Sequence, residues 1–187
     1  MIQKYIENPL LINNKKFDIR VWIVVVDYNP ARIYYYEDSY LRFCTEEYNI
    51  GNITNRYVHL TNNSIQKHNK TKKNDLNDSM WHIGKFVEHV GEESWTNIKE
   101  KILNIVVWSI KAGEGAVTSK KGSFEFFGFD FMIDEEYNPW LIEINMSPSM
   151  DYSTPVTKKI VKAGLKDTAN LIVNNYSNFT NGTQKNL

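Results

Sequence analysis

Three oxygen-bearing side chains in the last third of the chain have the types and the spacing to hold a metal ion. Asp130 lies in the mostly apolar segment 127–131. Glu143 and Asn145 lie two residues apart in the similar segment 141–145, so on a strand they share one face. Oxygen ligands suit Mg²⁺, which often shares its coordination shell with the phosphates of a nucleotide. The pattern fits a Mg²⁺–nucleotide site, and fits equally well three side chains that are partly exposed or paired with lysines.

A second row of charges, Lys16, Asp18 and Arg20, leads into the apolar segment 19–26 at a spacing of two residues. A cation–anion–cation row on one strand face could bind phosphate and ribose, because arginine offers a forked set of donors. The same row could be a charge ladder that keeps an edge strand from pairing. Taken alone, the pattern favours the edge-strand interpretation.

Four further features give weaker signals. Arg42 stands between apolar neighbours, and His59 begins a polar stretch. His59 is expected to be a hydrogen-bonded structural histidine rather than a catalytic base. Cys44 is expected to be a small buried residue, since nothing near it in the sequence argues for a reactive thiol. The basic stretch 67–73 is expected to be a solvated loop, with docking of an acidic partner as the alternative.

The elements that must position these residues follow from the hydrophobic pattern. Clusters of β-branched and aromatic residues between turns predict strands at 19–26, 32–36, 40–43, 124–133 and 140–145. Apolar residues at helical spacing predict helices at 80–90, 95–117 and 157–173. Ser94 is the expected cap of the second helix, and Lys120, Lys121 and Gly122 are its expected end. The Asn13–Asn14 pair predicts a turn, because asparagine tolerates a positive φ.

Two polar regions show little periodicity. The stretch 49–78 is predicted to be a long loop of the kind that is functional or disordered. The last stretch, 174–187, is predicted to be a polar, disordered tail. The chain is therefore expected to form one domain over residues 1–173, followed by that tail.

Composition excludes several classes of protein. The 187 residues are 42% hydrophobic, enough for one core, and 22 basic residues balance 22 acidic ones, which argues against a general nucleic-acid binder. One cysteine excludes a disulfide framework and a cysteine zinc site. The apolar runs are far shorter than the roughly 20 residues of a membrane span, and the start has no secretory signal pattern. We expect a soluble unit from a reducing compartment, without nucleic-acid or membrane partners.

Several segments, taken in order, resemble the tubulin tyrosine ligase-like family of amino-acid ligases over roughly residues 3–173. The matching segments are 3–11, 16–21, 40–42, 59–62 with Gln66, 128–131, 139–145 and 147–149. The segments 59–67, 123–128, 140–145 and 153–157 are most similar to the glycine ligases of that family. The resemblance implies an α+β, ATP-grasp fold in which two lobes clamp ATP. The sequence is similar to the C-terminal lobe, an antiparallel sheet flanked by helices, and the N-terminal lobe is missing from it.

The resemblance also implies roles for residues, with ATP and Mg²⁺ as cofactors. The implied nucleotide-binding residues are Gln3, Lys4, Tyr5, Ile6, Lys16, Asp18, Thr61 and Asn62. The first four would form a hinge strand whose backbone contacts adenine, and Asp18 would contact the ribose. Arg20 and Arg42 would be catalytic residues that face the phosphates or an acyl-phosphate. The implied Mg²⁺ ligands are Asp130, Glu143 and Asn145.

The implied reaction joins free glycine to glutamate side chains of acidic tubulin tails through an acyl-phosphate. Two alternatives stay open: a glutamate ligase of the same family, and a truncated, non-catalytic remnant that binds microtubules. A basic groove for the tails is expected, with Lys67, Lys70, Lys72, Lys73, Lys120 and Lys121 as candidates. Tubulin as a partner implies a cytoplasmic, cytoskeletal location, in a cilium or axoneme.

Overall fold

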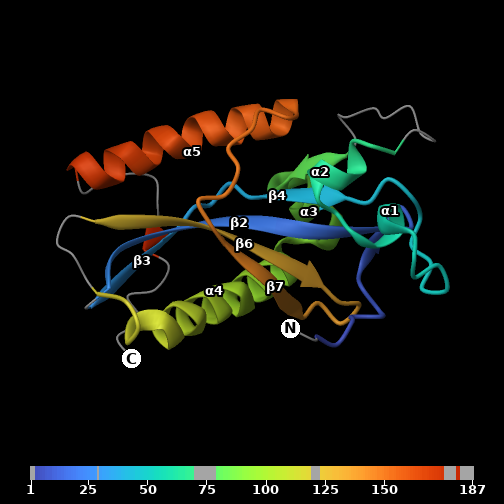
Figure 1. Cartoon of the computed structure of the whole chain (residues 1–187), viewed down its shortest axis with the longest axis horizontal. Coiled ribbons are helices and arrows are strands. Elements are labelled where there is room, and N and C mark those ends of the chain that lie inside the picture. Colours follow the sequence, from blue (N-terminus) through green and yellow to red (C-terminus); the bar gives the residue numbers. More distant parts are fainter. Residues whose placement is uncertain (1–2, 29, 70–78, 119–122, 175–179, 182–187) are drawn as a thin grey trace.

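The structure is a computed structural model that describes residues 3–28, 30–69, 79–118, 123–174 and 180–181. These residues form one antiparallel sheet with helices on both faces (Figure 1). The strands are β1 Leu11–Ile12, β2 Lys15–Tyr28, β3 Ala31–Tyr35, β4 Tyr40–Phe43, β5 Met80–His82, β6 Phe124–Ile133, β7 Pro139–Met146 and β8 Thr180–Asn181. The helices are α1 Arg56–His59, α2 Asn63–Gln66, α3 Ile83–Val90, α4 Glu92–Glu114 and α5 Pro155–Asn174. The expected α+β class, an antiparallel sheet flanked by helices, is confirmed.

The long strand β2 is the centre of the sheet. Along one edge it pairs with β6, and along the other it pairs first with β4 and then with β3. Arg20 therefore has a partner on each side, Tyr40 on β4 and Asp130 on β6. The edge-strand interpretation of the charged row is wrong, because β2 is an interior strand there. β7 extends the sheet beyond β6, and β5 extends it beyond β4.

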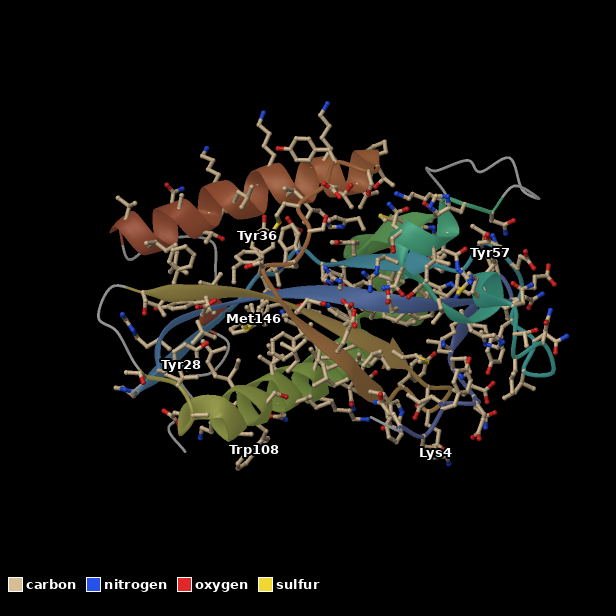
Figure 2. All side chains as sticks on the ribbon, viewed as in Figure 1. Lys4, Tyr28, Tyr36, Tyr57, Trp108 and Met146 are labelled. Atoms are coloured by element: carbon tan, nitrogen blue, oxygen red, sulfur yellow. The ribbon has the colours of Figure 1, made fainter. Side chains whose placement is uncertain are left out.

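The two faces of β2 differ in chemistry. One face is apolar from Phe17 to Val25 and packs against α3 and α4 through Phe17, Ile19, Val21, Ile23 and Val25. The opposite face begins with the charged row at Lys16 and becomes apolar at Trp22 and Val24, which pack beneath α5. Figure 2 shows Tyr36 of this second core between α5 and the sheet. Because α5 covers only the apolar end, the charged end of this face is left for a site.

The first hairpin forms as the sequence predicts. Asn13 and Asn14 both have positive φ values, 52° and 60°, and they join β1 to β2 in a two-residue turn. The strands expected at 124–133 and 140–145 form as β6 and β7, and they pair as a hairpin from Phe127 and Met146 to Ile133 and Pro139.

The first two predicted helices differ from the structure in their bounds. The helix expected at 80–90 begins at Ile83, because Met80–His82 pairs with β4 as β5. The cap expected at Ser94 is wrong: α4 begins at Glu92, directly after Gly91, whose φ of 88° ends α3. α4 ends at Glu114, earlier than the expected 117, and the expected stop at 120–122 lies outside the described residues.

The polar regions contain more structure than expected. The predicted loop 49–78 includes the two short helices α1 and α2. α5 ends at Asn174, and Thr180–Asn181 pairs with β3 as β8, which the prediction of a disordered tail did not include. Residues 70–78, 175–179 and 182–187 lie outside the described residues, so the domain boundary between 173 and 174 stays a prediction. Among the helices of the described segments, none combines the length and the apolar character needed to cross a membrane.

The close packing of α5 against the sheet depends on a glycine. A Cβ at Gly164 would come within 2.6 Å of Cζ3 of Trp22, a buried ring with little room to move. We expect Gly164→Ala to lower the free energy of unfolding by about 1–2 kcal/mol, since overpacking outweighs the gain in helix propensity. Urea unfolding of the two proteins measures the difference. Gly113→Ala in α4 is the control, because a Cβ there meets nothing within 4 Å; an equal loss in both variants would contradict the packing argument.

Candidate functional site

Four buried charges lie at the polar end of the sheet face that α5 leaves uncovered. The strand register sets Arg20 opposite Asp130 and Asp18 opposite Arg42. Arg20 donates to both carboxylate oxygens of Asp130, with its Nη2 2.9 Å from Oδ2. Arg42 donates from Nε and Nη2 to Asp18, at 2.8 and 2.5 Å, and its Nη2 also lies 2.8 Å from Asp130 Oδ2. The four side chains form one continuous network.

The network favours the charged forms of Asp130 and Arg42 despite their burial. Burial alone would raise the pKa of Asp130, but the hydrogen bonds from Arg20 and the charge of Arg42 hold that pKa below its ordinary value. Burial opposes the charged form of Arg42 as well, yet Asp18 and Asp130 raise the pKa of Arg42 well above its ordinary value. Two cations and two anions therefore balance within the network, so neither arginine adds a net charge to the cavities that it lines.

The three predicted metal ligands meet on one side of the β6–β7 hairpin. Glu143 pairs with Asp130 across the two strands. The amide nitrogen of Asn145 lies 3.0 Å from Oε1 of Glu143 and 3.4 Å from Oδ2 of Asp130. Glu143 is exposed, whereas Asp130 is buried and pairs with arginines rather than lysines. Asn145 is partly buried, so the alternative of partial exposure holds for Glu143 and Asn145. Among the described residues, no lysine forms an ion pair with Asp130 or Glu143.

The donor chemistry of this trio fits a hard cation such as Mg²⁺, because all three side chains offer oxygen. Among the described residues, no group of three or more His, Cys, Asp or Glu side chains is placed to hold a metal ion. A protein site here would therefore use the amide oxygen of Asn145 as its third ligand, which requires the amide to turn. Mg²⁺ keeps several positions for water or phosphate, so a partial set of protein ligands is sufficient. The assignment of these residues to a metal stays a prediction.

Two adjoining cavities open on this face. The first, about 310 Å³, is lined by every residue expected to bind a nucleotide: Gln3, Lys4, Tyr5, Ile6, Lys16, Asp18, Thr61 and Asn62. Met132 and Ile142 complete its wall with apolar surface. Figure 2 places Lys4 and Tyr57 at the same end of the sheet, where these segments meet. A concave, partly apolar site with a few convergent polar groups is the usual form of a small-molecule site.

The second cavity, about 350 Å³, continues beyond the first. Arg42, Asn62 and Glu143 line both cavities, and Arg20 and Asn145 line the second. Much of the rest of its wall comes from α2 and from the segment between β7 and α5, and the strands and α5 add Tyr40, Met80, Met146 and Thr157. Sequence reasoning missed Met132, Ile142 and Tyr40 as lining residues. The alternation of β6 and β4 could have indicated Met132 and Tyr40, since they share faces with Asp130 and Arg42.

The N-terminal segment lies beside the first cavity without joining the sheet. Gln3–Ile6 was expected to be a hinge strand, but these residues belong to no strand, because no described strand lies alongside to pair with them. Tyr5 fixes the segment instead. Its hydroxyl lies 2.6 Å from Nδ1 of His59 and accepts from Nζ of Lys16 at 3.3 Å.

His59 and Cys44 have the structural roles that were expected. The second ring nitrogen of His59, Nε2, lies 3.0 Å from the carbonyl oxygen of Asn52, so both ring nitrogens have partners. Cys44 is buried, and burial raises the pKa of its thiol to about 12. Thr61 donates to Oδ2 of Asp18 at 2.5 Å, which ties the segment before α2 to the arginine network.

Lys16 is a buried cation in the first cavity, and its position has a consequence for stability. Burial lowers the pKa of Lys16 from its ordinary 10.5, and the charge of Asp18 offsets this only in part. The unfolded chain therefore binds a proton that the folded chain has lost, in the pH range between the lowered pKa and 10.5. Across that range the parent protein should gain stability as pH rises, relative to Lys16→Met. Urea unfolding of both proteins at a series of pH values from about 7 to 10.5 measures the difference. If the free energies of unfolding of the two proteins change equally with pH, burial does not lower the pKa of Lys16.

The fold and the site together define a class: an α+β protein whose antiparallel sheet bears two adjoining cavities around a buried Arg–Asp network. Residues 1–181 match the Tubulin-tyrosine ligase family, and the chain belongs to this family. It is 47% identical over 192 residues to Tubulin glycylase 3B of Tetrahymena thermophila, covering 100% of the chain and 16% of that relative.

Two human proteins are also similar to this chain. The chain is 40% identical over 182 residues to human Tubulin monoglycylase TTLL3, which covers 92% of the chain and 23% of the relative. It is 38% identical over 185 residues to human Protein monoglycylase TTLL8, covering 92% of the chain and 21% of the relative. The expected likeness to glycine ligases is confirmed. The chain spans between 16% and 23% of the length of these three relatives.

Proposed function

We propose that this chain forms the ATP- and Mg²⁺-binding part of a ligase that attaches glycine to glutamate side chains of tubulin tails. One observation supports this most: the two cavities adjoin at Arg42, Asn62 and Glu143. A nucleotide in the first cavity would direct its phosphates toward a carboxylate and an amine in the second. Similarity to proteins named tubulin glycylase and monoglycylase supports glycine as the donor and tubulin as the acceptor.

The proposed reaction has two steps. In the first, a carboxylate oxygen of the acceptor glutamate attacks the γ-phosphorus of ATP, the bond from phosphorus to ADP breaks, and ADP leaves with the electron pair. In the second, the amine nitrogen of glycine attacks the carbonyl carbon of the acyl-phosphate. The C–N bond forms, the C–O bond breaks, and phosphate leaves with its electron pair. The nitrogen, which enters as an ammonium group, gives up two protons to solvent and keeps one in the amide. The products are an isopeptide, ADP and phosphate.

The protein's part in these steps is positioning and charge balance. Lys16 lines the first cavity as a buried cation, and Arg42 lies where the two cavities meet. Arg20 lines the second cavity, and Asp130 holds its guanidinium in place through two hydrogen bonds. Mg²⁺, held by Asp130, Glu143 and Asn145, would neutralise phosphate charge. Because the arginines are already paired, their geometry is set before a substrate binds.

The test uses the full-length protein with tubulin, Mg-ATP and labelled amino acids. We expect labelled glycine, and not labelled glutamate, to enter tubulin. Without glycine, hydroxylamine should trap the acyl-phosphate as a hydroxamate on tubulin. Incorporation of glutamate would favour the other donor. Salt-sensitive co-sedimentation with microtubules, together with no heat of Mg-ATP binding in calorimetry, would favour a non-catalytic remnant.

The cellular location follows only from this proposal. A ligase that acts on tubulin would be found in the cytoplasm with the cytoskeleton, and glycine ligation places it at a cilium or axoneme. Of the lysines expected to form a basic groove, Lys67 lines the second cavity. Lys70, Lys72, Lys73, Lys120 and Lys121 lie outside the described residues. Immunofluorescence of the tagged full-length protein in ciliated cells tests the location.

A further inference from the structure

The charged side chains that line the second cavity are of two kinds: those paired with an opposite charge and those that are not. Arg20 and Arg42 are neutralised by Asp130 and Asp18, as the hydrogen bonds above establish. Beyond these, the described residues that line the cavity bring three charges: Lys67, Glu143 and Asp151. Within the described part of the chain, neither Lys67 nor Asp151 has an ion-pair partner. The cavity therefore presents one available cation and one available anion besides the carboxylate of Glu143.

Lys67 and Asp151 come from different elements. Lys67 directly follows α2, and Asp151 belongs to the segment between β7 and α5. Both elements lie on the α5 side of the sheet (Figure 1). A ligand in the cavity would thus have a cationic group of the protein available from one wall and an anionic group from the other. Two opposite charges on separate walls match a ligand that itself has two opposite charges.

The segment that presents Asp151 is held at both ends. At its start, Ser147 has a φ of 53°, a conformation that L residues rarely adopt, and its N–H donates to the carbonyl of Phe126 at 3.2 Å. Pro148 lies directly over Gly128, where a Cβ would come within 2.9 Å of the proline Cβ. Backbone strain of this kind is retained where the surrounding structure fixes it, often at ligand sites.

At its other end the same segment is fixed by hydroxyl groups. The N–H of Thr154 donates to Oγ1 of Thr157 at 2.9 Å, and the N–H of Thr157 donates to Oγ1 of Thr154 at 3.1 Å. Asp151 itself donates its N–H to Oγ of Ser149 at 3.3 Å. The backbone that carries Asp151 is therefore anchored, while its carboxylate is exposed toward the cavity that it lines.

The remaining wall of the second cavity is mainly polar, with apolar surface from Met80, Met146 and Pro148. Its hydroxyl-bearing members are Tyr40, Ser64, Ser147, Ser149, Ser153 and Thr157. Hydroxyls can donate to a carboxylate and accept from an ammonium group. A small zwitterion, an α-amino acid without a charged side chain, satisfies all of these groups. A donor with a second carboxylate would place that charge near Glu143 and Asp151. Among the described residues that line the cavity, no unpaired cation besides Lys67 is available to balance it.

We infer that the second cavity is the binding site of the donor amino acid, with Asp151 binding its ammonium group and Lys67 its carboxylate. The inference rests on the proposed function and assigns the residues that bind the two charged groups of its donor. The ammonium group lies beside Glu143 in this arrangement, close to the junction of the cavities where the acyl-phosphate would form. Asp151 and Lys67 act on the donor and not on ATP, which makes their effects separable.

The experiment compares Asp151→Asn and Lys67→Gln with the parent in the full-length protein, using tubulin, Mg-ATP and glycine. Each variant should raise the glycine KM about tenfold or more, the loss expected for one charge-assisted hydrogen bond. The KM for ATP should stay within about twofold of the parent in both variants, and in Asp151→Asn the rate of hydroxamate formation without glycine should do the same. Asp151→Glu, which keeps the charge, should restore part of the glycine affinity. Glu88→Gln, an exposed charge change on α3 at the other face of the sheet, is the matched control.

The outcomes separate the inference from the proposed function. An unchanged glycine KM with normal hydroxamate formation overturns the inference and leaves the proposed function in place. Loss of hydroxamate formation in Asp151→Asn, with a normal thermal unfolding curve, also overturns it, because Asp151 would then act on the acceptor or the nucleotide. No hydroxamate from the parent protein overturns the proposed function, and the inference with it.

Discussion

Replacing Asp130 by alanine is expected to destabilise the protein by about 3–5 kcal/mol, the cost of leaving a buried charge without its partner. Arg20 would lose both of its hydrogen bonds to Asp130, and Arg42 would lose one of its two carboxylate partners. Both guanidinium groups are buried, so water can replace those bonds only in part. A loss of this size is a large share of the stability of a typical domain. Guanidinium chloride unfolding, followed by circular dichroism, measures the effect.

The control for Asp130 lies on the same hairpin. Glu135 is an exposed carboxylate in the turn between β6 and β7, and Glu135→Ala should change the stability by no more than about 0.5 kcal/mol. If Asp130→Ala unfolds the chain in water, Asp130→Asn provides a second measurement, because it keeps the shape and part of the hydrogen bonding. A loss below about 1 kcal/mol in both variants would mean that the arginines find other partners and that the network is not a structural unit.

The charged row on β2 illustrates what the sequence could predict and what it could not. Alternation placed Lys16, Asp18 and Arg20 on one face, and the structure agrees. Whether that face belonged to an edge or an interior strand depended on β4 and β6, whose pairing is set by contacts more than a hundred residues apart in the case of Arg20 and Asp130. The local pattern of residue types along one strand contains no information on a strand that lies so far away in the sequence. The same holds for Arg42, because only the pairing of β4 with β2 places it opposite Asp18.

The predicted starts of α3 and α4 were wrong for identifiable reasons. Serine is a good N-cap, so Ser94 was a reasonable choice, but the glycine at position 91 ends α3 and starts α4 in the same turn. The segment Met80–His82 has apolar residues at a spacing that a helix also allows, and only its pairing with β4 makes it a strand. In both cases a tertiary or turn effect overrode an ordinary preference.

The candidate site was predicted better than the bounds of these elements, and the reason is physical. Each of the residues expected to bind a nucleotide lines one cavity, although they come from the N-terminal segment, β2 and the segment before α2. Charged and polar groups that must be buried together are costly elsewhere in a core, so few arrangements accommodate them. The second cavity was harder to foresee, because several of its lining residues are serines, which also occur in any exposed loop.

Replacing Glu143 by glutamine is expected to lower the rate of glycine incorporation by at least about 100-fold while leaving the fold intact. Glutamine keeps an oxygen that can accept from Asn145, as Glu143 does at 3.0 Å, and the side chain is exposed, so the free energy of unfolding should change by less than about 0.5 kcal/mol. What is lost is the negative charge that would hold Mg²⁺ at the junction of the two cavities. The contrast with Asp130 is informative because Asp130 also pairs with two buried arginines, whereas no described arginine pairs with Glu143. Initial rates at several Mg²⁺ concentrations, with Glu135→Gln as the control, measure the effect, and an unchanged rate and Mg²⁺ dependence would remove Glu143 from the metal site.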